Sequence, residues 1–234
     1  MADDHVAARG AKGRALGLLG GTFDPVHYGH LRAADAVRRA LHLAEVRLFP
    51  AGDPPHRAAP VATAAHRLAM LALALPEFPG LVVDAREIAR AGKSYTVLTL
   101  EELRAEAPSR PLALILGVDA FAGLPTWHRW QAILDLAHLV VVTRPDAALA
   151  DALAGPLAEV WVARHVDDAA RLESQPAGAI YALTIAPQPI SATFIRRALA
   201  AGTDGLDAVR GMVPPAVLAY IDRNQLYRSR PDAT

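Results

Sequence analysis

Two histidines, His27 and His30, lie three residues apart directly after a glycine-rich turn. The apolar run 15–19 before that turn predicts a buried strand, and the two glycines after it allow the backbone to approach a ligand closely. A helix predicted from Gly29 would direct its first free N–H groups at the same place. Because imidazoles and backbone N–H groups both donate hydrogen bonds to phosphate oxygens, this stretch predicts a site for a nucleoside triphosphate.

The two histidines also have a simpler interpretation, in which they only cap or pack the first turn of the helix. The surrounding pattern favours a ligand site, because Leu31, Ala34 and Val37 would share one apolar face of that helix. A strand, a turn and an amphipathic helix therefore follow one another in the required order. The chain lacks G-x-x-x-x-G-K-[ST], and no G-x-G-x-x-G follows the first strand, which disfavours a kinase or an ordinary dehydrogenase.

A second helix entrance follows Ile190. Ser191 is its expected N-cap, Thr193 lies in its first turn, and Arg196 lies one turn further on. Two hydroxyls and a guanidinium at a helix start can hold an anion. A capped structural helix with a solvated arginine is the alternative.

Two loops that follow predicted strands carry polar groups. Asp119, close after Gly117, would accept hydrogen bonds from ribose hydroxyls, cap the next helix, or do both. The loop 50–57 contains too many prolines for regular structure and carries His56 and Arg57. These two side chains would either face the phosphates of a ligand or lie in solvent.

A pyridine nucleotide would find suitable groups elsewhere in the chain. Ser94 and Tyr95 precede a helix that begins at Thr96, and the free N–H groups of such a start favour a carboxylate. Trp127 is expected to open another helix, where it would either stack on a pyridine ring or pack in the core.

Together these motifs resemble the nucleotidyltransferase superfamily marked by [TH]-x-G-H, and within it the bacterial nicotinate-nucleotide adenylyltransferases. H-x-G-H alone would not separate that family from pantetheine-phosphate or flavin-mononucleotide adenylyltransferases, but the combination is specific. Three positions depart from the family pattern: Arg57 stands where lysine is more usual, Ala192 where serine is usual, and His128 where relatives often have an aromatic residue. The matching segments occur in the family's order over nearly the whole chain, at 20–31, 54–57, 94–96, 117–119, 127 and 190–196.

The resemblance implies that the mononucleotide phosphate directly attacks the α-phosphorus of ATP. Nicotinate mononucleotide would become nicotinic acid adenine dinucleotide, with release of pyrophosphate, in NAD synthesis. Mg²⁺ would be carried mainly by the ATP phosphates, and we assign no metal-binding residues. The implied catalytic residues are His27, His30 and Arg196. The implied ATP contacts are Gly20, Gly21, Thr22, Phe23, His27, His30, Gly117, Asp119, Ser191, Thr193 and Arg196. The implied mononucleotide contacts are Asp24, His56, Arg57, Ser94, Tyr95, Thr96 and Trp127.

Two alternatives to this activity stay open at the level of sequence. The first is an adenylyltransferase for another acceptor, namely nicotinamide mononucleotide, pantetheine phosphate or FMN. The second is a nucleotide-binding module without catalysis.

Short apolar runs alternate with helical patterns, which predicts a doubly wound, mostly parallel α/β sheet of Rossmann-like type. Predicted strands are 15–19, 46–49, 81–83, 112–116, 139–142, 160–162 and 180–185. Predicted helices are 29–42, 63–75, 96–106, 127–136, 147–153, one after Ser191, and 214–225. We expect one nucleotidyltransferase domain over 15–227, a flexible extension at 1–14 and a tail at 228–234.

Composition narrows the class further. The chain has 234 residues, 53% of them hydrophobic, which is enough for one sizeable core. With 24 basic and 24 acidic residues the formal net charge is zero, so we expect neither nucleic acid nor a membrane as partner. The absence of cysteine, of a long apolar run and of a basic leader predicts a cytoplasmic protein. The oligomeric state is left open, a homo-oligomer included.

Overall fold

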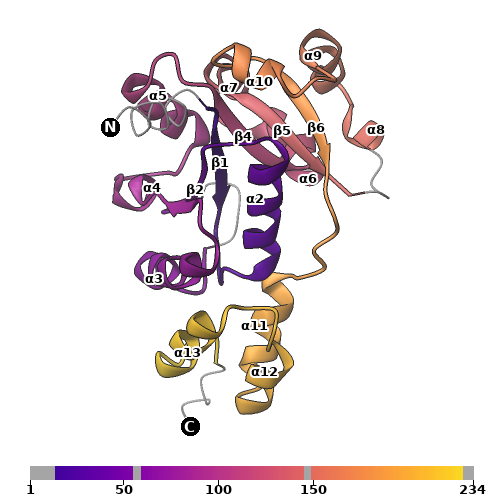
Figure 1. Cartoon of the computed structure of the whole chain (residues 1–234). Helices are drawn as coiled ribbons and strands as arrows, with labels where there is room; N and C mark the ends of the chain where they lie inside the picture. The colour runs from indigo at the N-terminus through magenta and orange to yellow at the C-terminus, as the bar shows by residue number, and fades with distance from the viewer. Residues whose placement is uncertain (1–13, 55–58, 145–148, 229–234) are drawn as a thin grey trace, which may run out of the picture.

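The computed structural model describes residues 14–54, 59–144 and 149–228. Six strands form one sheet in the order β3-β2-β1-β4-β5-β6 (Figure 1). Every neighbouring pair in it is parallel. The strands are β1 (Leu16–Gly21), β2 (Glu45–Pro50), β3 (Leu81–Val83), β4 (Leu112–Gly117), β5 (His138–Thr143) and β6 (Ile180–Thr184). The predicted doubly wound parallel fold is confirmed.

The sheet is apolar on both faces. Successive side chains of a strand point to opposite faces, and in β4 Ala113 and Ile115 enter one core while Leu112, Leu114 and Leu116 enter the other. Such a strand reads as an unbroken apolar run in the sequence, because helices cover both of its sides.

The helices divide between the two faces. Buried side chains of α2 and α3 belong to the first core, and those of α5, α6, α7 and α9 belong to the second. The helices are α2 (Tyr28–Ala40), α3 (Ala64–Ala74), α4 (Arg86–Ala89), α5 (Thr96–Glu106), α6 (Val118–Ala122), α7 (Trp130–Leu136), α8 (Leu149–Ala152), α9 (Pro156–Arg164), α10 (Arg171–Ser174), α11 (Ala192–Ala200), α12 (Thr203–Ala208) and α13 (Pro215–Arg223). The chain winds outward from β1 in one direction and from β4 in the other, so a crevice is expected where the carboxyl ends of β1 and β4 meet. Within the described ranges, no helix is long and apolar enough to cross a membrane.

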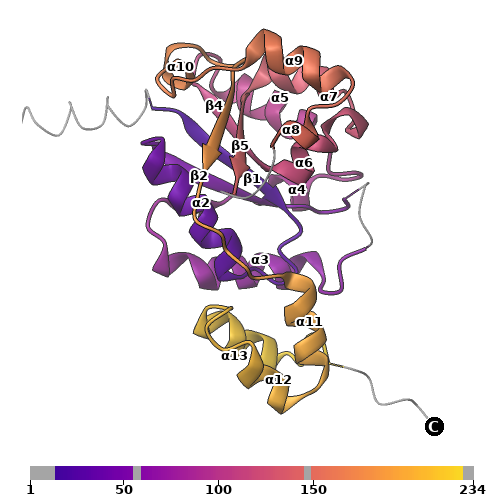
Figure 2. The same ribbon diagram turned by 90° about the vertical axis from the view of Figure 1, so that its right-hand side faces the viewer.

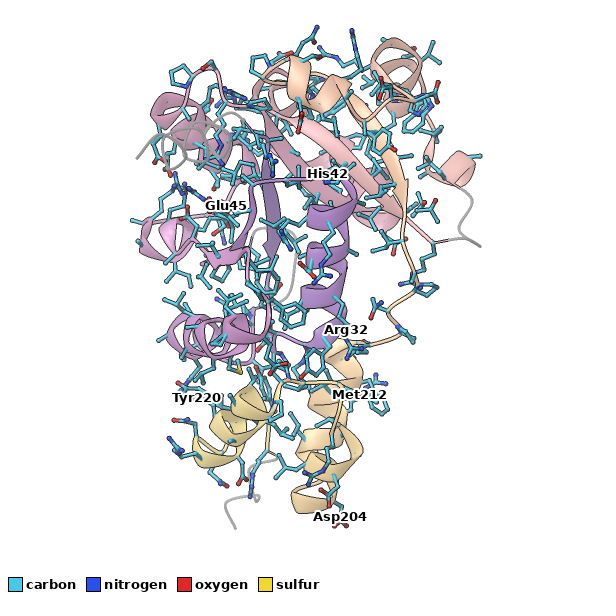
Figure 3. All side chains as sticks on the ribbon, in the orientation of Figure 1. Arg32, His42, Glu45, Asp204, Met212 and Tyr220 are labelled. Atoms are coloured by element: carbon cyan, nitrogen blue, oxygen red, sulfur yellow. The ribbon has the colours of Figure 1, made fainter. Side chains whose placement is uncertain are left out.

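The last three helices, α11 to α13, lie beyond the carboxyl ends of the strands (Figures 1 and 2). The backbone N–H of Tyr28 donates to the carbonyl of Met212 over 2.9 Å, and His66 Nδ1 lies 2.9 Å from the hydroxyl of Tyr220. Figure 3 places Met212 and Tyr220 at this junction, near the end of α2 that carries Arg32. Buried side chains of α11 and α13 join the first core, so these helices pack on the same core as α2 and α3.

One predicted element is wrong, and another begins later than predicted. The residues 160–162, expected as a strand, lie inside α9, where Val162 is 86% exposed. Helix α9 begins at Pro156, and proline is well suited to the first turn of a helix because its missing N–H would have no helical partner. Helix α7 begins at Trp130 rather than at Trp127, because residues 124–126 form a separate 3₁₀ turn.

Candidate active site

The glycine-rich turn joins β1 to α2 as the sequence predicts. His27 is the N-cap residue of α2 in an extended backbone conformation, with φ −148° and ψ 167°, but its side chain makes no capping hydrogen bond. Its carbonyl accepts from the N–H of His30 over 3.0 Å, which closes the first turn. The imidazole of His27 is therefore not used as a cap.

The two imidazoles stack on each other. Their ring centroids lie 3.7 Å apart with an angle of 23° between the planes, and the ring of Phe23 meets His30 edge-on at 5.1 Å. A side chain at Gly29 would bring its Cβ within 2.8 Å of His27 Nδ1, which explains why glycine separates the pair. His27 Nδ1 is buried and has no hydrogen-bond partner among the described residues. A buried polar atom of this kind destabilises the fold unless a ligand supplies the missing hydrogen-bond partner.

Burial lowers the pKa of His27 to about 4. The folded protein therefore binds fewer protons than the unfolded chain between about pH 6.5 and 4, and its stability falls as the pH drops through that window. We expect the free energy of unfolding to lose about 3 kcal/mol more in the wild-type chain than in a His27→Asn variant over this range. Denaturant titrations of both proteins at intervals between pH 7 and 4 would measure it. Parallel pH curves for the two proteins would contradict the prediction.

The larger cavity, about 910 Å³, opens beside the histidine pair at the carboxyl ends of β4 and β5. It combines imidazoles, hydroxyls and a carboxylate, the groups expected around a nucleotide. Its lining includes the predicted ATP contacts His27, His30, Gly117, Asp119, Ser191 and Thr193. Ser191 is the N-cap residue of α11, as predicted, although its hydroxyl makes no capping hydrogen bond.

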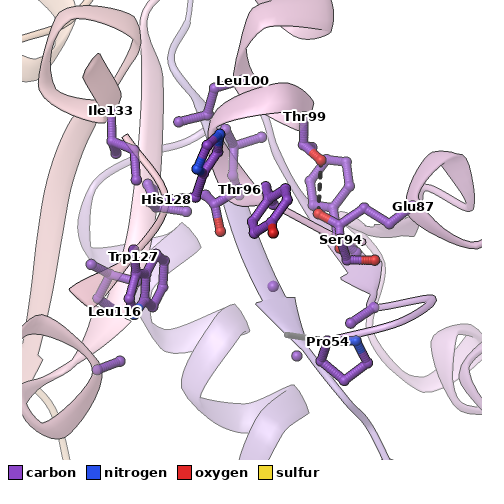
Figure 4. A pocket seen from close by; sticks show the side chains of 18 of the residues that line it. Pro54, Glu87, Ser94, Thr96, Thr99, Leu100, Leu116, Trp127, His128 and Ile133 are labelled. Carbon is purple, nitrogen blue, oxygen red and sulfur yellow. Dashed lines mark hydrogen bonds between the residues drawn. The ribbon is translucent and has the colours of Figure 1, made fainter. Parts of the chain in front are cut away.

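A smaller cavity, about 280 Å³, lies on the other side of Asp119. Its aromatic wall contains Trp127 and Tyr95, and Figure 4 shows Trp127 and His128 beside this space. The ring centroids of Tyr95 and His128 lie 4.4 Å apart. Thr96, the first residue of α5, also faces this space. Because Asp119 lines both cavities, they meet at the carboxyl end of β4.

Several predicted residues lie elsewhere than expected. Gly20 and Gly21, at the end of β1, and Thr22, which follows it, line the smaller cavity rather than the larger one. The carboxylate of Asp24 lines neither cavity: it is buried and accepts hydrogen bonds from the N–H groups of residues 61 and 62 and from the hydroxyl of Tyr227. Its expected contact with the mononucleotide is therefore corrected to an internal role.

Three other predicted residues need separate mention. Arg196 lies outside both linings, but its Nη1 donates to the Asp24 carbonyl over 2.7 Å and its Nη2 to Thr193 Oγ1 over 3.4 Å, at the edge of the larger cavity. His56 and Arg57 lie outside the described residues.

The sequence did not point to Glu87 and Thr99, which line the back of the smaller cavity. Thr99 Oγ1 donates to Glu87 Oε1 over 2.8 Å, and burial raises the pKa of the carboxyl group (Figure 4). A raised pKa lessens the negative charge that Glu87 would set against an anionic ligand. Thr99 could have been found, because it lies one helical turn after Thr96 on the same face.

The comparisons first give the class of protein. A family model described as cytidylyltransferase-like matches residues 18–198. A parallel Rossmann-like sheet with a histidine-lined cavity at the carboxyl ends of its strands is consistent with that class.

Individual relatives narrow the class to one family. The chain is 51% identical over 220 residues to a probable nicotinate-nucleotide adenylyltransferase of Laribacter hongkongensis, covering 94% of this chain and 97% of the relative. It is 50% identical over 220 residues to the protein of the same name from Pseudomonas fluorescens, covering 93% and 99%. The chain therefore belongs to the nicotinate-nucleotide adenylyltransferase family, which confirms the resemblance. The fold is shared with a Plasmodium falciparum nicotinic acid mononucleotide adenylyltransferase complexed with NaAD, at a TM-score of 0.67 and 16% identity over 92% of this chain and 97% of that one.

Proposed function

We propose that this protein joins ATP to nicotinate mononucleotide, giving nicotinic acid adenine dinucleotide and pyrophosphate in NAD synthesis. The observation that carries the proposal is the pair of cavities that meet at Asp119. One lies beside the stacked histidines and suits a triphosphate, and the other has an aromatic wall and the start of α5 and suits a pyridine with a carboxylate. Reacting phosphates would lie between them.

The reaction needs positioning and charge stabilisation more than a protein nucleophile. An oxygen of the mononucleotide phosphate forms a bond to the α-phosphorus of ATP, while the bond from that phosphorus to the bridging oxygen breaks and pyrophosphate leaves with the electron pair. His27 and His30 would donate hydrogen bonds to the ATP phosphates, and Arg196 would neutralise charge on the departing pyrophosphate. The low pKa of His27 leaves one ring N–H as donor at neutral pH, and an adjacent phosphate would favour its protonation.

Mg²⁺ is proposed to arrive with ATP. Among the described residues no group of three or more histidine, aspartate or glutamate side chains could hold a metal ion. Phosphate oxygens are good ligands for Mg²⁺, which when bound would offset their negative charge. Asp119 lines both cavities, and we propose that it accepts from a ribose hydroxyl.

Acid over amide specificity follows from the start of α5. Helix N-termini favour negative charge, so a carboxylate beside Thr96 should bind better than a carboxamide. We expect kcat/KM for nicotinate mononucleotide to exceed that for nicotinamide mononucleotide by at least about tenfold.

A pyrophosphate-release assay with ATP, Mg²⁺ and a panel of acceptors tests the proposal. The panel contains both pyridine mononucleotides, pantetheine phosphate and FMN, with an acceptor-free reaction as control. Preference for any acceptor other than nicotinate mononucleotide would contradict the substrate assignment. If the protein binds nucleotide but releases no pyrophosphate with any acceptor of the panel, the result would instead support a non-catalytic module.

A further inference from the structure

Arg67 lies in the first turn of α3 and is only 1% exposed. Among the described residues it has the largest volume of all the fully buried ones. A buried guanidinium is costly unless its donors are satisfied and its charge is balanced. Its Nη1 donates to the carbonyl of Thr22 over 2.8 Å, its Nε to that of Ala62 over 3.3 Å, and its Nη2 to that of Gly52 over 3.5 Å. All three acceptors are backbone carbonyls outside the helices and strands.

Asp24 places a negative charge in the surroundings of Arg67. Burial lowers the pKa of Arg67, and the negative charge of Asp24 opposes that shift. Its Oδ1 accepts from the N–H of Ala62 over 3.1 Å and from the hydroxyl of Tyr227 over 2.7 Å, and its Oδ2 accepts from the N–H of Val61 over 2.7 Å. Arg67 therefore binds the carbonyl of Ala62 while Asp24 binds its N–H, so both side chains fix the segment before α3.

Two of the carbonyls that Arg67 holds lie at or beside the wall of the smaller cavity, because Thr22 lines it and Gly52 follows its lining residue Ala51. Thr22 follows β1 and itself lines that cavity, while Gly52 follows the neighbouring strand β2. The N–H of Gly52 donates to Ser94 Oγ over 2.9 Å, two residues before the start of α5. Arg67 thus binds the segments that follow β1 and β2 directly, and it is linked through Gly52 to the segment before α5. It does not itself line the cavity.

We propose that Arg67 is a positioning residue that sets the shape of the acceptor cavity through its three bonds to backbone carbonyls. The inference rests on the proposed function, because it assigns the smaller cavity to the mononucleotide. The guanidinium spaces the loops after β1 and β2 through three carbonyls. Its loss lets those loops shift relative to α5, while the histidine pair, to which none of these three hydrogen bonds goes, keeps its geometry. Acceptor binding is therefore affected more than ATP binding.

Steady-state kinetics of Arg67→Met and Arg67→Lys separate the two substrates. In Arg67→Met the KM for nicotinate mononucleotide rises by about tenfold or more, since small misplacements of binding groups have large kinetic effects. The KM for ATP stays within about twofold of wild type, because the larger cavity lacks these contacts. Arg67→Lys, which keeps the charge but not the planar fork, recovers part of the acceptor affinity.

Met70→Ala is the matched control, because Met70 lies on the same helix and is fully buried in the first core. It lowers Tm through lost packing and leaves the acceptor KM unchanged. Tyr227→Phe removes one hydrogen bond to Asp24 without removing the ring, and it raises the acceptor KM by about two- to tenfold. It replaces Arg67→Met as the test if that variant fails to fold.

A wild-type acceptor KM in Arg67→Met or, where that variant does not fold, in Tyr227→Phe, overturns the inference. An equal rise in Met70→Ala also overturns it, because loss of stability would then explain the effect. Failure of the proposed function looks different: the wild-type protein itself releases no pyrophosphate with nicotinate mononucleotide.

Discussion

Replacing His30 with alanine is expected to lower kcat by about 10²- to 10³-fold while the fold stays intact. The side chain lines the larger cavity and stacks on His27 with 3.7 Å between ring centroids. A preorganised donor stabilises most when charge develops on the transferred phosphates, so turnover falls by an amount equivalent to about 2.7–4 kcal/mol. Single-turnover measurements with ATP and nicotinate mononucleotide would give the rate of the chemical step.

His42→Asn serves as the control for removing a histidine from the same region of the chain. His42 is exposed beyond the far end of α2 and has φ +50°, a conformation that asparagine tolerates well. The His42→Asn variant should have the turnover of the wild type. Near wild-type turnover in His30→Ala would remove His30 from the mechanism.

Replacing Arg196 with glutamine is expected to lower kcat by on the order of 10²-fold. The guanidinium bonds to the Asp24 carbonyl and to Thr193 Oγ1, which holds it at the edge of the larger cavity. Glutamine keeps a hydrogen-bond donor but removes the positive charge that would offset the leaving pyrophosphate. The deficit should therefore appear in kcat, measured at saturating concentrations of both substrates.

The neighbouring arginine provides a matched control. Arg197 is exposed on the same helix, so Arg197→Gln removes the same charge from α11 without touching the site. Equal losses in the two variants would mean that general electrostatic attraction, and not the place of Arg196, explains the effect.

Much of the fold was predictable because long patterns agree with their surroundings. The run 112–116 and the helix 96–106 were predicted within one residue of β4 and α5, since the first is an unbroken apolar run of strand length and the second is too long for a strand. The run 160–162 was not, because three apolar residues fit a buried strand or one turn of a helix equally well. Only the packing of α9 against the second core decides between them.

The placement of candidate residues beside a cavity was predictable where a motif lies at the end of a strand or the start of a helix. His27, His30, Asp119 and Thr96 all face the cavities for that reason. The internal role of Asp24 could not be predicted, because its partners lie 37 to 203 residues away in the sequence. An aspartate in such a motif is often a ligand-binding residue. Only the tertiary contacts show that the carboxylate oxygens of Asp24 accept hydrogen bonds from within the protein.

The central claim is that the stacked imidazoles bind the triphosphate at the bend between β1 and α2. A crystal structure of this protein with a non-hydrolysable ATP analogue tests it most directly. We predict phosphate oxygens within hydrogen-bond distance of His27 and His30, with the nucleoside in the larger cavity. An analogue bound elsewhere, with this bend left empty, would contradict the account.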